Sequence, residues 1–377
     1  MTQDRIAARS VRAAVARTAG LEFTIEDLTL DPPRDGEVLV RVVATGMCHT
    51  DAAVCTRDLP TPLPVVLGHE GAGVVEAVGR GVTGVAPGDH VVLSFMACRA
   101  CAACRSGRPS VCPSLAPLNF AGARNDGSHA LHSSWGPVHD RFFGQSSFAT
   151  YAIADQRNAV RVRKDAPLEL LGPLGCGIQT GAGSVLNGLR VRHGQSFCVF
   201  GSGAVGLAAV MAARVAGATT IIAVDVVQSR LSLASELGAT HVVNAREGDV
   251  LAAIRSAVQI GLDTALDTTG NVEVIRTAVA ALRPGGICGI LGASPPGAEL
   301  RLDVGDLMGN SKCVRGIVEG DSVPEIFIPE LIELHLQGRF PFDKLVRFYP
   351  LEEINTAAAD SARGDAVKPI IRMPPAD

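Results

Sequence analysis

Four cysteines that lie close together in the sequence form a metal-binding pattern. Their spacing is C-x2-C-x2-C-x7-C in a turn-rich segment, and they are Cys98, Cys101, Cys104 and Cys112. Four thiolates in one short loop can surround a zinc ion and leave no open position, as structural zinc sites do. An iron–sulfur cluster is the rival interpretation, but the seven-residue gap before Cys112 departs from the ferredoxin motif. The pattern therefore predicts a structural zinc site.

A second set of possible metal ligands is dispersed along the chain. Cys48 begins a Cys-His-Thr-Asp run, His69 lies in Gly-His-Glu, and Cys176 lies between two glycines. Two thiolates and one imidazole would leave the fourth tetrahedral position to water or an alcohol, which is the catalytic arrangement of zinc. Spacing alone does not bring these three residues together, because a single buried cysteine more often packs in a core.

A glycine-rich loop predicts dinucleotide binding. An apolar stretch is followed by the run Gly201-Ser202-Gly203-Ala204-Val205-Gly206, which opens a helix of small residues. Glycines there permit a tight turn and a close approach to a pyrophosphate, whose charge the amides at the helix start can bind. Asp225 ends the next apolar run, 19 residues after Gly206, where a carboxylate meets the ribose hydroxyls and repels a 2′-phosphate. The pattern favours NAD over NADP; the alternative is a glycine turn in a domain that binds no nucleotide.

The elements that must position these residues differ between two regions. Residues 1–178 contain short alternating runs between turns, which are typical of an antiparallel barrel or sandwich. In residues 179–320, apolar runs alternate with helical patterns, which predicts a doubly wound parallel sheet of α/β class. The expected strands there are Phe197–Phe200, Thr220–Val224, His241–Val243, Thr264–Asp267 and Ile287–Leu291. The expected helices are Val205–Ala216, Ser229–Leu237, Val250–Ala257 and Val272–Leu282.

Two further segments complete the expected architecture. After residue 320, a helix over Pro329–Gln337 and a strand near Val346–Tyr349 are expected to return to the first domain. The polar segment 114–144 is rich in Gly and His and lacks periodicity. We expect an excursion that lines or covers the site, with a disordered surface loop as the equal alternative.

Composition excludes several classes of function. The chain has 34 basic and 38 acidic residues, a net charge of −4 and a single tryptophan, Trp135, so it offers nucleic acid neither a basic field nor a stacking platform. Ten cysteines are too dilute for a disulfide scaffold in 377 residues. The apolar stretch from Phe197 to Ala213 is broken by glycines and fits a buried strand, turn and helix better than a membrane span. No apolar signal-peptide core precedes the first expected strand, so we expect a cytoplasmic protein.

In combination and order, these motifs resemble the zinc-containing medium-chain alcohol dehydrogenases. The resemblance covers essentially the whole chain and adds the pattern Gly-His-Glu-x2-Gly-x5-Gly at Gly68–Gly79. The phrases Pro64–Gly71 and Phe143–Phe148 are most similar to the aryl (benzyl) alcohol dehydrogenase branch. The resemblance implies a GroES-like, mostly-β catalytic domain over 1–178, completed by 321–377, and a Rossmann NAD-binding domain over 179–320.

The resemblance also implies roles for the residues near the dispersed ligands. Catalytic zinc is expected on Cys48, His69 and Cys176, with Glu70 as a nearby carboxylate that helps to exchange ligands. Asp51 is expected to orient the His69 ring; an ordinary helix cap after Thr50 is the alternative. Thr50 is expected to hydrogen-bond the alcohol and to begin proton release. The liver-type enzymes end their proton relay with a histidine, and Ala53 occupies that position here.

Further residues are expected to contact the cofactor. His49 and Lys368 match positions that touch the pyrophosphate; a solvated histidine and a surface lysine are the alternatives. The resemblance assigns the remaining cofactor contacts to Thr180, Gly201, Gly203, Ala204, Val205, Gly206, Asp225 and Arg230.

The resemblance implies an oxidoreductase with two zinc ions per chain that transfers a hydride between a primary aryl or allylic alcohol and NAD. Small residues near the pocket, Ala52 and Ala53, agree with such substrates. Two alternatives are a dehydrogenase of glutathione–formaldehyde adducts, for which no cationic pair is identifiable, and a non-catalytic zinc- and nucleotide-binding protein. The family pairs through the edge of the nucleotide-binding sheet, here near Leu300–Val318, so a homodimer or homotetramer without nucleic-acid or membrane partners is expected.

Overall fold

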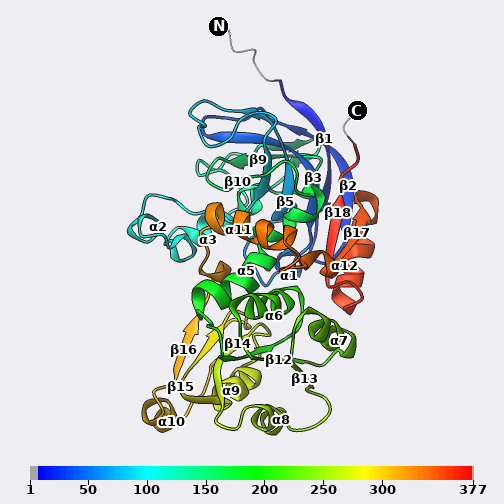
Figure 1. Ribbon diagram of the computed structural model, residues 1–377. Coiled ribbons are helices and arrows are strands. Elements are labelled where there is room, and N and C mark those ends of the chain that lie inside the picture. The colour runs from blue at the N-terminus through cyan, green and yellow to red at the C-terminus, as the bar shows by residue number, and fades with distance from the viewer. Residues whose placement is uncertain (1–6, 376–377) are drawn as a thin grey trace. The chain divides into compact units, whose positions relative to one another are not determined.

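The computed structural model describes residues 7–375, which divide into two compact units (Figure 1). The first unit comprises the chain up to Cys176, Val323–Glu333 and the chain from Asp343 onward. The second comprises Gly177–Ser322 and Leu334–Phe342. Residues 334–342 thus differ from our expectation, which placed them with the first domain. The sequence carries no signal of this change, because one helix, α11 (Pro324–Leu336), runs through the boundary at Glu333.

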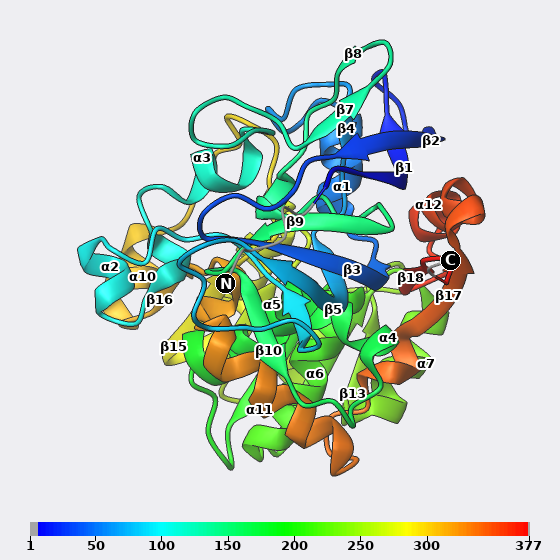
Figure 2. The ribbon, with the colours of Figure 1, turned by 90° about the horizontal axis from the view of Figure 1, so that it is seen from above.

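The first unit is built on two sheets, and α12 (Ile354–Arg363) lies against β17 and β18 of the second sheet (Figure 2). The first sheet has the order β4 (Val65–Val66), β1 (Arg9–Ala16), β2 (Phe23–Leu30), β7 (Leu131–Ser133) and β8 (Gly136–Pro137). The second has the order β10 (Ala159–Val162), β6 (His90–Leu93), β5 (Glu70–Val78), β3 (Glu37–Gly46), β18 (Lys368–Arg372) and β17 (Val346–Pro350), with β9 (Tyr151–Asp155) also paired to β3. The other helices are α1 (His49–Cys55), α2 (Ala102–Arg105), α3 (Leu115–Phe120) and α4 (Leu168–Leu171).

The register of the second sheet brings distant segments to one place. On one side of β3, Gly46 lies opposite Glu70 of β5, and on the other side it lies opposite Ile370 of β18. The chain leaves β3 toward Cys48 and enters β5 from His69, so the end of one strand and the start of the next present their side chains together. Strand β18 begins at Lys368 beside the same edge.

The second unit contains a six-stranded parallel sheet with interspersed helices. Its order is β13 (His241–Asn244), β12 (Thr220–Asp225), β11 (Ser196–Phe200), β14 (Leu262–Asp267), β15 (Leu282–Ile290) and β16 (Cys313–Gly316). In chain order this is 3-2-1-4-5-6, the doubly wound order of dinucleotide-binding domains. The helices are α5 (Gly177–Gly183), α6 (Ala204–Ala216), α7 (Gln228–Leu237), α8 (Val250–Ala257), α9 (Val272–Ala280) and α10 (Val304–Gly309).

The expected strands and helices of this region are present, with two differences. The expected helix Val272–Leu282 ends at Ala280, and Leu282 already begins β15. A turn-forming Pro-Gly-Gly run inside β15, together with an irregular register against β14, concealed the start of that strand. Strand β16 was not expected, because Cys313–Gly316 is short and is not apolar throughout.

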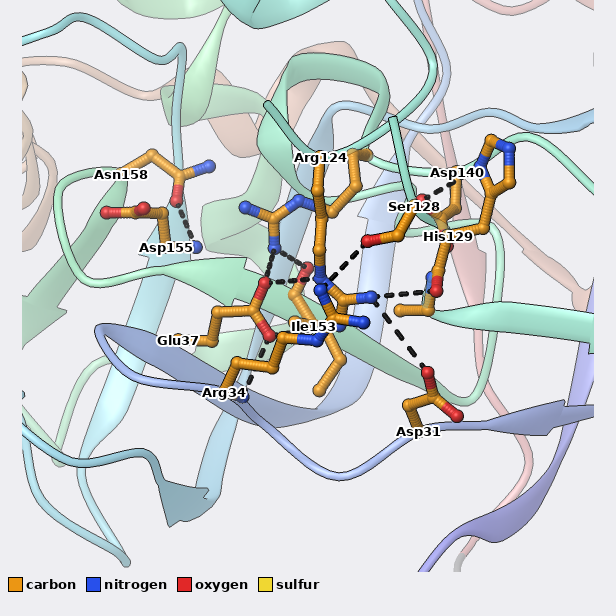
Figure 3. Close-up of polar contacts among 12 residues, drawn as sticks. Asp31, Arg34, Glu37, Arg124, Ser128, His129, Asp140, Ile153, Asp155 and Asn158 are labelled. Carbon is orange, nitrogen blue, oxygen red and sulfur yellow. Dashed lines mark hydrogen bonds and ion pairs between the residues drawn. The ribbon is translucent and has the colours of Figure 1, made fainter. Parts of the chain in front are cut away.

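The segment 114–144 is more regular than expected. It contains α3 and the β7–β8 hairpin, and β7 pairs with β2. Buried charges fix its position. The Arg124 guanidinium donates to both carboxylate oxygens of Glu37 at 2.8 and 3.1 Å (Figure 3). Asp140 accepts hydrogen bonds from the amides of Ala130 and Leu131. The polar composition of the segment gave no sign of this regular structure, because its polar groups form hydrogen bonds and ion pairs with one another inside the unit.

Among the described residues, no helix combines the length and the apolar character that crossing a bilayer would require.

The Glu37–Arg124 pair should carry measurable stability. Burial raises the pKa of Glu37, but hydrogen bonds and charges from Arg124 and Arg141 outweigh it and hold the pKa below its ordinary value. We expect Glu37→Gln to lower the free energy of unfolding by about 3 kcal/mol at pH 7, because Arg124 is left buried without its counter-charge. Urea unfolding followed by the fluorescence of Trp135, which lies in the first unit, measures this loss.

The difference in unfolding free energy between the wild type and Glu37→Gln should depend on pH. A carboxyl with a depressed pKa contributes stability that is present above its unfolded pKa, about 4.3, and is lost as pH falls through the folded pKa. This difference in unfolding free energy should therefore be complete above about pH 5 and should become smaller in more acidic solution. Glu76→Gln, which breaks the half-exposed Arg41–Glu76 pair, is the control and should cost about 1 kcal/mol or less. Equal losses in the two variants would contradict the assignment.

Candidate functional site

Four potential metal ligands converge in the first unit. Cys48, His69, Glu70 and Cys176 each place one ligand atom within 4.8 Å of the others. The side chains of His69 and Glu70 are fully buried, and the imidazole Nε2 has no nitrogen or oxygen partner among the described residues. Two sulfurs, one imidazole nitrogen and a carboxylate form a donor set that suits zinc. The residues therefore fit the ion that the family resemblance implied.

Asp51 fixes the geometry of this cluster. Its Oδ1 lies 3.0 Å from His69 Nδ1 and accepts a second hydrogen bond from the Gly68 amide, while its Oδ2 accepts from the Cys48 amide at 3.0 Å. A carboxylate at Nδ1 holds the proton there and leaves the Nε2 lone pair for a metal. Asp51 is also the third residue of α1 and bonds to the capping residue, Cys48. One side chain thus contacts both the His69 ring and the capping residue of α1, and its role in orienting a metal ligand stays a prediction.

Local backbone structure explains why His69 is placed so accurately. Gly68 has a φ of +86°, in the left-handed region, and a Cβ at this position would lie 2.5 Å from the Phe148 backbone nitrogen. Only glycine fits such a position without displacing its neighbour. On the other side of the cluster, the Ser94 hydroxyl donates to the Gly175 carbonyl at 2.7 Å, directly before Cys176.

The electrostatics of the cluster favour a bound cation. The pKa of Cys48 lies well below its ordinary value, chiefly because of a hydrogen bond with Cys176 and also because of His69, although burial opposes the shift. Burial would lower the pKa of His69, but Asp51 and Cys48 together raise it well above its ordinary value. A thiolate beside an imidazolium is a charge pattern that a divalent cation replaces, with release of a proton.

Glu70 is held by a lysine that the sequence analysis assigned elsewhere. The Lys368 ammonium donates to both Glu70 carboxylate oxygens, at 2.9 and 3.0 Å, and to the Met47 carbonyl at 3.1 Å. Only 3% of Lys368 is exposed, so it is not the surface lysine of our alternative interpretation. Burial raises the pKa of Glu70, while the Lys368 charge lowers it. A cofactor contact for Lys368 stays a prediction.

The remaining residues expected near the metal lie on α1. The Thr50 hydroxyl oxygen is 3.7 Å from the Cys48 sulfur, so this hydroxyl lies at the edge of the cluster. His49 is exposed at the start of the same helix, and Ala53 lies one turn further on. The roles of Thr50 and His49 stay predictions.

The four clustered cysteines form a second candidate metal centre in the first unit. Their sulfurs lie within 4.8 Å of one another, with 3.9 Å separating Cys98 from Cys104 and Cys101 from Cys112. These distances exclude disulfides and approach the edge of about 3.8 Å in a tetrahedron with 2.3 Å zinc–sulfur bonds. Backbone hydrogen bonds from Ala100 and Cys101 lower the pKa of Cys98 to about 6, which favours the thiolate that binds metal.

The glycine loop of the second unit joins β11 to α6. A Cβ at Gly206 would lie 1.9 Å from the Gly201 carbonyl oxygen, so helix and turn touch there. A Cβ at Gly203, which caps α6, would meet nothing within 4 Å. The start of α6, with Ala204 and Val205 in its first turn, thus follows a glycine whose Cβ position is open, and amides at a helix start are the groups that bind phosphate.

Asp225 lies at the end of β12 beside this loop. Its carboxylate accepts from the amides of Ser202, Val226 and Val227 at 2.6, 2.7 and 2.8 Å. A carboxylate has about four lone-pair sites, so about one remains for a ligand. On α7, the Nε of Arg230 is buried without a hydrogen-bond partner among the described residues. The Thr180 hydroxyl, on α5, donates to Glu319 at 3.2 Å.

Sequence reasoning missed two residues that touch His69. The Gln145 amide nitrogen donates to the His69 carbonyl at 2.9 Å, and its oxygen accepts from the Gly71 amide at 3.0 Å. The Phe143 ring stacks on the imidazole, with 4.5 Å between ring centroids. Both residues lie in the stretch Phe143–Phe148. The sequence analysis noted this stretch for its family resemblance, but the resemblance did not indicate a contact with His69.

Comparison with known families supports the fold of each unit. A model described as the alcohol dehydrogenase GroES-like domain matches residues 34–164, and one described as zinc-binding dehydrogenase matches residues 204–335. The expected fold class, a GroES-like domain and a Rossmann-type nucleotide-binding domain, is confirmed.

Individual relatives are similar over almost their whole length. Geraniol dehydrogenase of Castellaniella defragrans is 47% identical over 372 residues, 98% of this chain and 99% of that protein. A crystal structure of an alcohol dehydrogenase zinc-binding domain protein from Burkholderia ambifaria is 59% identical with a TM-score of 0.96, covering 98% of this chain and 100% of that one. The benzyl alcohol dehydrogenase of Acinetobacter calcoaceticus is 50% identical with a TM-score of 0.94, covering 97% and 100%.

Two glycines of the loop should respond differently to a methyl group. We expect Gly206→Ala to lower the stability of the second unit by about 1–3 kcal/mol, because its Cβ would overlap the Gly201 carbonyl. Gly203→Ala should leave the melting temperature unchanged, because its Cβ would meet nothing within 4 Å. Thermal unfolding of the two variants tests this pair, and a larger loss in Gly203→Ala would contradict the loop geometry.

Proposed function

Because the chain belongs to the zinc-containing medium-chain alcohol dehydrogenases, we propose that it interconverts primary aryl or allylic alcohols and their aldehydes with zinc and NAD. The observation that carries the proposal is the interaction of Glu70 with Lys368, which sets Glu70 apart from the other three residues of the cluster. Lys368 engages both of its carboxylate oxygens, so Cys48, His69 and Cys176 are the donors best placed to hold an ion. Three protein ligands with a fourth position left for substrate is the arrangement of catalytic zinc.

The chain's own residues have distinct tasks in this reaction. Zinc, when bound, supplies a Lewis acid that lowers the pKa of an alcohol hydroxyl. Asp51 contacts Nδ1 of His69, which leaves Nε2 available to the ion, and the thiolates of Cys48 and Cys176 would complete the protein ligands. The Thr50 hydroxyl oxygen would accept the alcohol proton while its own hydroxyl proton passes to the next group of a relay. The cofactor carries the hydride, and the protein supplies orientation and electrostatics.

The relay beyond Thr50 differs from that of the liver-type enzymes. Ala53, one turn further along α1, cannot carry a proton. We therefore propose that the proton leaves through water or a cofactor hydroxyl instead of an imidazole.

NAD is the proposed nucleotide because of Asp225. Three of its lone-pair sites hold the backbone of the loop, so the carboxylate is fixed where a ribose hydroxyl can donate to the remaining one. The same fixed negative charge opposes a 2′-phosphate. Gly201, Gly203 and Gly206 shape the loop, and the unpartnered Nε of Arg230 is an additional donor.

The substrate class rests on the relatives. One protein at 47% identity is a geraniol dehydrogenase and a structure at 50% identity is a benzyl alcohol dehydrogenase, so an allylic and an aryl alcohol are both represented. A primary alcohol beside an unsaturated carbon is common to the two.

Three further properties belong to the proposal. A second zinc on the four-cysteine loop gives two per chain, supported by the sulfur separations. A homodimer or homotetramer forms through the edge of the parallel sheet, where β16 is the last strand and Val304 and Met308 are each 76% exposed. The proposed location is the cytoplasm, where cysteines that bind metal stay reduced.

The test is an assay of NAD reduction with benzyl alcohol, geraniol and ethanol, with the metal content of the same sample. We expect two zinc ions per chain and turnover of the first two alcohols well above that of ethanol. Two zinc ions with no turnover of any of the three alcohols would contradict the substrate class, and hydroxymethylglutathione would be assayed next. Inactivity with that substrate as well would leave a non-catalytic role.

Removal of single thiols should separate the two metal centres. Cys48→Ser should abolish turnover and lower the zinc content from two to one, because one ligand of the catalytic site is lost. Cys101→Ser should remove the other ion, and Cys313→Ser, which changes an exposed cysteine outside both clusters, is the control and should keep both. Elemental analysis with parallel assays measures these outcomes, and full activity in Cys48→Ser would overturn the assignment.

The nucleotide preference should depend on the charge of Asp225. Asp225→Asn keeps an acceptor oxygen for the amides of Val226 and Val227, loses the oxygen that accepts from Ser202, and removes the negative charge that repels a 2′-phosphate. We expect the ratio of kcat/KM for NAD to that for NADP to fall about tenfold or more. Asp249→Asn, at the N-cap of α8, is the control, because asparagine caps a helix equally well and the ratio should not move. An unchanged ratio in Asp225→Asn would place the discrimination elsewhere.

A further inference from the structure

The turn that precedes Ser147 is held in an unusual backbone conformation. Arg141, Phe143 and Ser146 have φ values of 64°, 52° and 53°, in the left-handed region that residues with a Cβ seldom adopt. Such conformations persist only where the surrounding structure holds them, and they concentrate at functional sites. This turn therefore requires an explanation in terms of what it positions.

The turn places two aromatic rings against His69. The Phe143 ring is stacked on the imidazole, with centroids 4.5 Å apart and planes inclined by 27°. The Phe142 ring meets the same imidazole edge-on, at 5.4 Å and 89°. Phe120 of α3 packs edge-on against Phe143, with 5.3 Å between ring centroids.

A hydrogen bond alone does not determine the plane of an imidazole. Asp51 fixes Nδ1, but a ring held at one atom can still tilt about that contact. The Nε2 lone pair lies in the ring plane, so a tilt would turn it away from the two thiols. A stacked ring on one face and an aromatic edge on another restrict that tilt.

We propose that Phe143 is a positioning residue that fixes the plane of the His69 imidazole, so that its Nε2 faces Cys48 and Cys176. The proposal rests on the proposed function, in which His69 binds the catalytic metal. In this proposal, the left-handed turn serves to present one face of the Phe143 ring to the His69 imidazole.

Polar contacts of Arg141, Asn158 and Ser146 hold the turn, and with it Phe143, in place. The Arg141 guanidinium donates to the Ile153 carbonyl at 3.2 Å and lies 3.4 Å from Glu37, which connects the turn to the buried charges of Figure 3. The Asn158 amide donates to the Phe143 carbonyl at 3.0 Å. The Ser146 hydroxyl accepts from the Phe142 amide at 3.0 Å and donates to the Val66 carbonyl at 2.5 Å.

The experiment measures the catalytic metal directly. Zinc-loaded wild type and Phe143→Leu are challenged with a chelator, and the release of each ion is followed over time. Cobalt-substituted samples report the ligand geometry through their visible absorption bands. We expect Phe143→Leu to release one of its two ions about tenfold faster, since loss of groups that orient a metal ligand typically costs 10–100-fold in affinity or activity. The cobalt bands of that site should change, while the ion of the four-cysteine loop should leave at its wild-type rate.

Three further variants separate ring stacking from general packing. Phe143→Tyr keeps the ring and should retain slow release. Phe23→Leu removes one ring of another buried aromatic pair in the same unit, Phe23–Phe148, and should also retain slow release. If Phe143→Leu does not fold, Phe143→Gly replaces it, because glycine accepts the left-handed backbone while lacking the ring.

The outcomes are distinct. Wild-type release and cobalt bands in Phe143→Leu, or equally fast release in Phe23→Leu or Phe143→Tyr, would overturn the positioning role. A wild type that holds no metal at Cys48, His69 and Cys176 would instead overturn the proposed function on which this inference rests.

Discussion

The candidate site depends on one buried carboxylate. Asp51 accepts hydrogen bonds from the backbone of Cys48 and Gly68 and contacts the ring of His69, so it connects the start of α1, the turn before β5 and a candidate metal ligand. A buried carboxylate is costly unless donors surround it, and these three satisfy it. The same contacts that make Asp51 tolerable in the interior therefore set the separation between a thiol and an imidazole. A change at Asp51 would therefore affect both the cap of α1 and the position of the His69 ring.

The two sulfur-containing centres illustrate different ways to build a metal site. In the four-cysteine loop, every donor comes from 15 consecutive residues, and backbone amides of the loop itself stabilise the sulfurs. The other centre is assembled from three distant segments, and its geometry relies on strand register, on Asp51 and on rings from a separate turn. The first arrangement requires only local structure, whereas the second requires most of the first unit to be folded.

This difference explains how much the sequence could predict. The cysteine loop and the glycine loop were identified from local spacing, and the alternation of strands and helices in the second unit follows from periodicity. The dispersed ligands were assigned only through resemblance, because nothing local connects Cys48, His69 and Cys176. The Lys368–Glu70 pair spans 298 residues, and no pattern in either segment indicates it. The segment 114–144 looked irregular because its order comes from buried charges and aromatic contacts, which leave no period in the sequence.

The insertion of β18 between β3 and β17 has a consequence for the order in which the protein forms on the ribosome. The Gly177–Ser322 part of the second unit is continuous and has left the ribosome before β18 is synthesised, whereas the sheet that carries the dispersed ligands is incomplete until residues 368–372 emerge. During synthesis, β3 therefore has an unpaired edge next to Cys48, and Glu70 is without its lysine. Unpaired strand edges are where nascent chains misassociate. Pairing of β18 with β3 thus covers the edge beside Cys48 and brings Lys368 to Glu70 in one step.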